Sequence, residues 1–277
     1  MNSTQDEATI DVFFIGVGKC GTSWIYKHLT KRSDVGVPSI KEPYVLNSPP
    51  EKYAEVIADL YGAQRPRCDF SNVYYWDPTI PSKIIEHNPD AKVVLTVRKP
   101  SKRVSSHFGF LQRNGEFVGM DLVEYLDSGD PEDLVARSDY QRVLDRVTAV
   151  TQREKILVLP LELLSSDAQL YADRLADFLD LPRREVDDSD REKVLGRASA
   201  RMPVINRAAK TLATAMRERG HLKMLSKLKE SEQVRSVLFR SSTDGAGSDL
   251  DETRFPASLK ALDGAYLDFL EKNDAAF

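Results

Sequence analysis

The chain has 277 residues, of which 41% are hydrophobic and 30% are charged, and its 39 Lys and Arg against 43 Asp and Glu give a formal net charge of -4. This composition is typical of a globular protein, and no stretch approaches the ~18 consecutive apolar residues that a membrane-spanning helix needs. The two cysteines, Cys20 and Cys68, make neither a disulfide framework nor a zinc site, and the first residues lack the features of a signal peptide. We therefore expect a cytoplasmic protein.

Strands and helices alternate along the first two thirds of the chain. Strands are predicted where short apolar runs end at a glycine or a basic residue, and helices where apolar residues recur on one face. In chain order, the predicted elements are strand 11–15, helix 22–31, strand 35–37, helices 51–61 and 81–87, strand 92–97, a helix from 101, helix 134–150, strand 156–159, and helices 167–179, 207–229 and 257–271. This order predicts one domain over residues 1–277, with an α/β core round a mainly parallel sheet at 1–180 and a mainly helical region at 181–277.

The charges are unevenly distributed. Residues 197–240, the basic segment, hold 11 Lys and Arg and only 3 acids, whereas the rest of the chain is acidic. Such a segment can bind an anionic partner in spite of the negative net charge. Its apolar residues at helical spacing, among them Leu212 and Met216, favour an amphipathic helix with a solvated basic face, so no nucleic-acid partner is expected.

A glycine-rich loop, residues 16–21, joins the first strand to the first helix. Backbone N–H groups and the positive end of the helix dipole converge in such a loop, and Lys19, Thr22 and Ser23 add a charge and two hydroxyl groups. The pattern predicts a site for a phosphate-like anion, with a purely structural turn as the alternative. It differs from a Walker A loop, because Lys19 lies two positions before the last glycine instead of directly after it.

A second anion site is predicted at the end of strand 92–97. Nucleoside triphosphatases usually place a magnesium-binding Asp after such a strand, but here Arg98 follows it. Two basic sites without a magnesium carboxylate indicate a ligand with two separate phosphate groups and a reaction that needs no metal.

Three motifs in this order resemble those of sulfotransferases that use 3'-phosphoadenosine 5'-phosphosulfate (PAPS). They are FIGVGKCGTS at 14–23, KEPY at 41–44 and VRKPSKRVSSH at 97–107. The resemblance is closest to the carbohydrate-type branch, which includes heparan sulfate sulfotransferase domains and bacterial relatives, and covers about the first 180 residues. It implies a P-loop-like three-layer sandwich with helices on both faces of the sheet, PAPS as co-substrate without a metal, and a small-molecule or carbohydrate acceptor.

The resemblance also assigns roles to individual residues. Arg98 and Ser106 match the pair that binds the 3'-phosphate, and Lys19 would also stabilise the departing phosphate oxygen during catalysis. The residues that would hold the 5'-phosphosulfate are Gly18, Lys19, Cys20, Gly21, Thr22 and Ser23. The thiol of Cys20 lies near a helix N-terminus, where its pKa can fall, although a plain loop residue is the simpler interpretation.

Two residues compete for the role of general base. Glu42, in the Lys41-Glu42-Pro43 turn, matches the glutamate that takes the acceptor's proton in similar enzymes, and Lys41 would orient the sulfuryl group. The alternative for Glu42 is a solvated carboxylate paired with Lys41. His107 is the rival base, because its intrinsic pKa lies near neutrality.

The chain also departs from the family pattern. Phe70 stands where heparan-type relatives have a lysine that contacts donor and acceptor, so acceptor recognition is expected to differ. Tyr74, Tyr75 and Trp76 form an aromatic cluster that either stacks on an acceptor or packs in the core. The sequence leaves open the acceptor, O- or N-sulfation and the oligomeric state.

Two other functions fit parts of the pattern. One is a P-loop nucleotide or small-molecule kinase, which requires Mg-ATP. The other is a nucleic-acid-binding protein that uses the basic segment and binds less tightly as salt increases.

Overall fold

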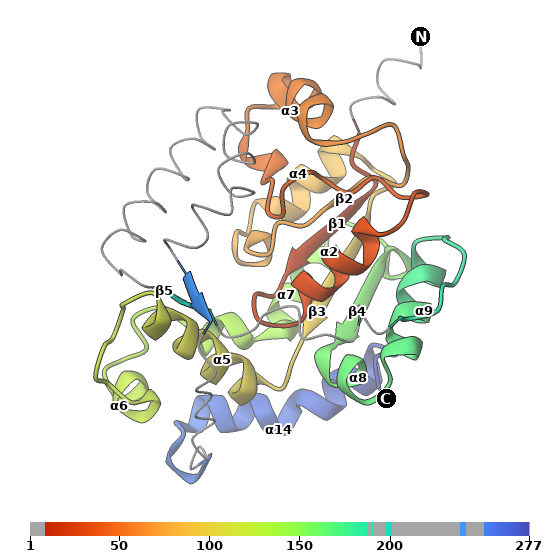
Figure 1. The fold of residues 1–277 in the computed structure, drawn as a ribbon. Coiled ribbons are helices and arrows are strands. Elements are labelled where there is room, and N and C mark those ends of the chain that lie inside the picture. Colours follow the sequence, from red (N-terminus) through yellow and green to blue (C-terminus); the bar gives the residue numbers. More distant parts are fainter. Residues whose placement is uncertain (1–8, 188–189, 191–197, 201–238, 242–251, 277) are drawn as a thin grey trace.

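The computed structural model describes residues 9–187, 190, 198–200, 239–241 and 252–276 (Figure 1). The predicted helix at 207–229 and most of the basic segment lie outside the described residues.

The centre of the fold is a parallel sheet with strand order β2-β1-β3-β4. Its strands are β1 (Val12–Gly16), β2 (Cys68–Asp69), β3 (Lys92–Val97) and β4 (Ile156–Pro160). Nearly every residue of these strands is buried, which explains why they appear in the sequence as continuous apolar runs rather than alternating patterns. The predicted strands at 11–15, 92–97 and 156–159 are confirmed.

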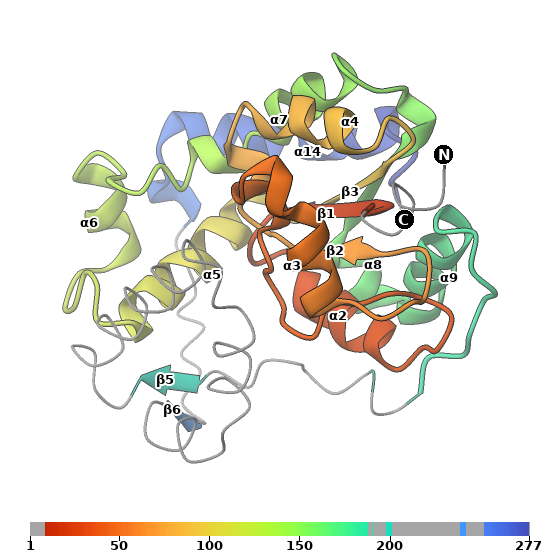
Figure 2. The same ribbon diagram turned by 90° about the horizontal axis from the view of Figure 1, so that it is seen from above.

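Helices cover both faces of the sheet, which confirms the three-layer sandwich. Successive residues of β1 point to opposite faces, so Phe13 packs in one core cluster and Phe14 in the other. The Phe14 face is covered by α2 (Thr22–Thr30), α8 (Leu161–Ser166) and α9 (Ala168–Phe178). The Phe13 face is covered by α3 (Tyr53–Leu60), α4 (Ile80–His87), α7 (Tyr140–Thr148) and α14 (Ala257–Lys272). Figure 2 shows α4, α7 and α14 on one side of β1 and β3, and α2, α8 and α9 on the other.

A third core cluster lies beside the sheet, round α5 (Pro100–Arg113) and α6 (Leu122–Asp127). The start of α14 contributes Leu259 to this cluster. Asp263 of α14 also accepts a hydrogen bond from the backbone N–H of Ser101 at 2.8 Å. The helix predicted to start at 101 is therefore confirmed, and its first turn is fixed by a residue from the far end of the chain.

Two predictions were wrong in detail, and one pair of strands was not predicted. Residues 35–37 form no strand; Gly36 makes a single bridge to Arg67, and Pro38 soon follows, which has no N–H to continue a ladder. The helix predicted at 134–150 begins at Tyr140, because Asp139 caps it by accepting from the N–H of Arg142 at 3.1 Å. The pair that was not predicted is β5 (Ala198–Ala200) and β6 (Phe239–Ser241), which run antiparallel.

Among the described residues, no helix is long and apolar enough to cross a membrane.

Candidate active site

The glycine loop joins the carboxyl end of β1 to the N-terminus of α2 (Figure 1). Gly16 and Gly21 have φ values of 132° and 94°, which favour glycine, and Lys19 also lies in the left-handed region at 76°. The loop is anchored to β3, because the N–H of Val17 donates to the carbonyl of Thr96 and the Thr96 hydroxyl donates to the carbonyl of Gly16, both at 2.9 Å. Gly21 precedes α2 without any side-chain cap, so the first amide groups of that helix face the loop.

Lys19 is a partly buried cation in a cationic environment. Its Nζ lies 3.7 Å from the centroid of the Phe110 ring. Burial lowers the pKa of the Lys19 ammonium to about 8, and the positive charges of Arg113 and Lys41 add to this effect. A bound anion would offset both causes, so this is the electrostatic environment expected of an anion site.

Arg98 directly follows the carboxyl end of β3, and its carbonyl accepts a hydrogen bond from the Tyr140 hydroxyl at 2.7 Å. Lys99 and Lys102, which follow it, are paired with acids, at 3.2 Å and 3.6 Å from Glu252. Within the described residues, by contrast, no carboxylate pairs with the guanidinium of Arg98. In this respect Arg98 differs from the two lysines that follow it.

Ser106 lies in the second turn of α5. The helical spacing of α5 places Arg103, His107, Phe110 and Arg113 on the same face of the helix as Ser106. Arg103, Phe110 and Arg113 act on the site but were not predicted. Extending the helical period from Ser106 would have identified them.

Glu42 lies in a strained turn close to Lys19. Its φ is 66° and that of Tyr44 is 54°, and the left-handed conformation costs a non-glycine residue roughly 1–2 kcal/mol. The Glu42 carboxylate accepts hydrogen bonds from Lys41 Nζ at 3.1 Å, the Tyr44 hydroxyl at 3.2 Å and Asn72 Nδ2 at 2.8 Å. The carboxylate is also near enough to act on the pKa of Lys19, which it raises. The structure therefore brings two of the predicted residues together, and adds Asn72, which was not predicted.

His107 is held by a buried arginine. Nη2 of Arg103 lies 3.0 Å from His107 Nδ1, and because a guanidinium only donates, Nδ1 must accept. The proton of the neutral ring is then on Nε2, which can donate but not accept. This arrangement favours Glu42 over His107 as the acceptor of a proton.

The family model of the sulfotransferase domain matches residues 9–220. The chain belongs to the sulfotransferase family. The protein is therefore a sulfotransferase, an enzyme of a PAPS-dependent family, and the alternative of a P-loop kinase is set aside.

One solved structure agrees with this membership at the level of the fold. A sulfotransferase from Alicyclobacillus acidocaldarius superposes with a TM-score of 0.56 at 22% identity, over 67% of this chain and 89% of that one. The sulfotransferase domain from the curacin biosynthetic pathway gives 0.46 at 17% identity, over 66% and 76% of the two chains. The mouse sulfotransferase SULT7A1 complexed with PAP gives 0.41 at 18% identity, over 68% and 63%. Among curated proteins, none matches this sequence.

Several side chains near the sulfotransferase site serve packing. Burial raises the pKa of the Cys20 thiol to about 12, which agrees with the interpretation of Cys20 as a plain loop residue rather than a reactive thiol. Phe70 is buried and stacks on Phe14 with ring centroids 4.3 Å apart. Tyr74 and Tyr75 are buried in the core, and only the half-buried Trp76 of the aromatic cluster remains for contact with an acceptor.

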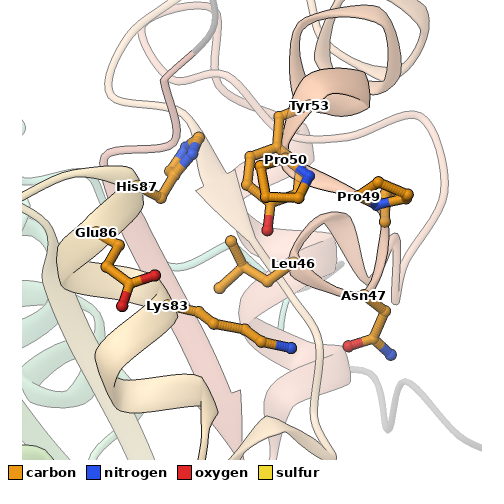
Figure 3. Close-up of a pocket in the computed structure, with 9 residues that line it drawn as sticks. Leu46, Asn47, Pro49, Pro50, Tyr53, Lys83, Glu86 and His87 are labelled. Atoms are coloured by element: carbon orange, nitrogen blue, oxygen red, sulfur yellow. The ribbon is translucent and has the colours of Figure 1, made fainter.

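A pocket of about 530 Å³ lies between η1 (Val45–Asn47), η2 (Pro50–Lys52), α3 and α4 (Figure 3). In Figure 3, the side chain of Lys83 extends from α4 in the direction of Asn47. The lining residues are Leu46, Asn47, Ser48, Pro49, Pro50, Tyr53, Lys83, Glu86 and His87. None of the predicted site residues is among them, although η1 begins only three residues after Glu42. The pocket was not predicted, and it is distinct from the glycine loop.

Proposed function

We propose that the protein transfers the sulfuryl group of PAPS to a hydroxyl or amine group of a small-molecule or carbohydrate acceptor and releases PAP. The observation that carries this proposal is Lys19, a cation whose pKa is lowered to about 8 at the start of a helix and close to the carboxylate of Glu42. An anion-binding lysine beside a base is the pair of groups that sulfuryl transfer requires.

The glycine loop would bind the 5'-phosphosulfate. Lys19, with the N–H groups of Gly21, Thr22 and Ser23, would stabilise the phosphate oxygen on which charge develops as the S–O bond breaks. Gly18 would let the phosphosulfate approach the backbone closely. Cys20 has a different part in this proposal: its N–H donates to the carbonyl of Val17 at 3.3 Å and its thiol points to the carbonyl of Gly18, so it shapes the loop.

The 3'-phosphate would be bound by Arg98 and Ser106. Support comes from the charges round them, since Lys99 and Lys102 are already paired with acids while Arg98 is not paired within the described residues. The N-terminus of α5, which begins at Pro100, adds the favourable end of its dipole.

The acceptor's proton would pass to Glu42. As the acceptor oxygen or nitrogen attacks sulfur, the bond from sulfur to the 5'-phosphate oxygen breaks, PAP leaves with that electron pair, and Glu42 takes the proton. Lys41, which contacts Glu42 at 3.1 Å, would orient the sulfuryl oxygens, and His107 would donate a hydrogen bond from Nε2.

We further propose that residues 1–277 form a single sulfotransferase domain that acts in the cytoplasm, with residues 181–277 on the acceptor side of the α/β core. The contact of Asp263 with the first turn of α5 supports one domain, because it joins the C-terminal region to the helix that carries Ser106.

Ligand-dependent thermal stability tests the donor. PAP at 100 times its Kd would stabilise the protein by about 2.7 kcal/mol, and Mg-ATP at the same concentration should have little effect. Lys19→Ala should abolish both the stabilisation by PAP and the transfer of ³⁵S from labelled PAPS. Stabilisation by Mg-ATP but not by PAP would refute the proposal.

A further inference from the structure

The turn that carries Glu42 is held by three buried side chains that the proposed reaction does not use. The Ser71 hydroxyl accepts a hydrogen bond from the backbone N–H of Tyr44 at 2.9 Å and donates its own proton to Asp69 Oδ1. The Tyr74 hydroxyl accepts from the N–H of Leu46 at 2.8 Å. Asp69 and Ser71 are fully buried, and Tyr74 is 2% exposed. Asp69, Ser71 and Tyr74 are called the support cluster below.

The conformation of the turn explains why it needs such support. Glu42 and Tyr44 both have positive φ values, and a non-glycine residue stays in that region only where surrounding contacts fix it. The N–H of Tyr44 is one of these contacts, and it depends on the Ser71 hydroxyl. Ser71 in turn is oriented by Asp69, because its single proton must point to the carboxylate for its lone pair to face Tyr44.

The segment that follows the support cluster also touches the glycine loop. Asp69 pairs with Phe13 in the sheet, and the strand of Phe13 leads directly into the loop. A Cβ placed on Gly16 would lie 2.6 Å from the carbonyl oxygen of Asn72, so the two backbones are in close contact. The side chain of the same Asn72 donates to Glu42 Oε1 at 2.8 Å. Residues 69–72 therefore set the separation between the loop and the Glu42 carboxylate.

The chemistry of Asp69 is difficult to explain by packing alone. Burial raises the pKa of its carboxyl to about 7, and the hydrogen bond from Ser71 acts against this rise. A buried carboxyl is unfavourable unless hydrogen bonds compensate it, so an apolar residue would fill this space at less cost.

We propose that Asp69 and Ser71 are positioning residues, which fix the Tyr44 amide and thereby aim the Glu42 carboxylate at the acceptor; this inference rests on the proposed function, in which Glu42 is the base. Neither residue touches the reacting atoms. Their effect on the reaction passes through the orientation of the turn.

Amide hydrogen exchange tests the support of the turn without any substrate. In Ser71→Ala, we expect exchange at Tyr44 to be about tenfold faster or more, because the N–H loses its acceptor. Ile156→Val, a core change in β4, is the matched control and should leave the Tyr44 amide unchanged. An unchanged rate in Ser71→Ala would overturn the inference.

A double-mutant cycle tests the link to catalysis, with labelled PAPS and the fastest acceptor from a panel of phenols and simple glycosides. Ser71→Ala should lower kcat by about tenfold to 10²-fold and leave the Kd for PAP within about twofold. In the Glu42→Gln background, the same change should lower kcat by less than about twofold, because the residue through which it acts is already lost. Equal losses in both backgrounds would overturn the positioning role.

Substitutions of Asp69 provide the conservative comparison. Asp69→Asn keeps an acceptor oxygen for Ser71 and should retain most of kcat, whereas Asp69→Ala should lose as much as Ser71→Ala. Loss in both variants to the same extent would contradict the role of that oxygen. If the wild-type protein transferred sulfate to no acceptor, the proposed reaction and this inference would both be refuted. If the wild-type protein were active but the effects of Ser71→Ala and Glu42→Gln on kcat were additive, only this inference would be refuted.

Discussion

Lys19 should make PAP binding sensitive to pH in a range where few other side chains titrate. In the free protein, burial and the nearby cations lower its pKa to about 8, and the bound phosphate should hold its proton well above that value. PAP affinity is then nearly constant below pH 7 and falls as the pH rises through 8. With a pKa of 8, the protonated fraction falls from about nine tenths at pH 7 to about one tenth at pH 9, so Kd should increase roughly tenfold.

Calorimetric titration with PAP from pH 6.5 to 9.5 measures this change in Kd. The ionic strength is kept constant, because salt would screen the same charges. The phosphates of PAP have their second pKa near 6 and contribute little above pH 7. Lys19→Arg is the matched control: its guanidinium stays charged, so its Kd should vary by less than about twofold over the same range. An equal pH dependence in wild type and Lys19→Arg would show that another group titrates and would refute the reasoning.

Two further predictions concern stability. Gly16→Ala should destabilise the protein by about 1–3 kcal/mol in chemical denaturation, because the new Cβ would clash with Asn72 and the φ of Gly16 is 132°. Gly18→Ala is the control and should cost less, since no atom lies within 4 Å of its new Cβ. Equal losses of stability in the two variants would contradict the proposed clash with Asn72. Arg103→Met should lower the free energy of unfolding by about 3 kcal/mol or more, because four hydrogen bonds from its guanidinium are lost. Arg142→Met on the surface is the control and should change it by no more than about 0.5 kcal/mol. A small loss for Arg103→Met would mean that the buried charge of Arg103 is itself unfavourable.

Local patterns were sufficient to predict the elements that are buried on both faces and the loop between them. β1, β3 and β4 are nearly continuous apolar runs in the sequence. α2 follows a glycine loop, and the sequence of that loop sets the loop's conformation. The motifs also predicted Lys19, Glu42 and Arg98 as site residues, and in the structure the Glu42 carboxylate lies near enough to Lys19 to act on its pKa.

Elements defined by distant contacts were not predicted. β2 has only two residues, Cys68 and Asp69, and it is a strand only because these residues pair with β1. The pairing of β5 with β6 joins residues about 40 positions apart, and no local pattern reports it. The role of Ser71 likewise depends on a hydrogen bond to a turn 27 residues away, which spacing along the chain does not reveal.

The contact between α14 and α5 has a consequence for how the protein matures. Asp263 fixes the first turn of the helix that carries Ser106, and Glu252 neutralises Lys99 and Lys102 beside Arg98. These acids are synthesised after every strand of the central sheet. While the chain is still on the ribosome, the region round Arg98 therefore has an excess of uncompensated cations, and a nascent chain should attract polyanions less selectively than the finished enzyme.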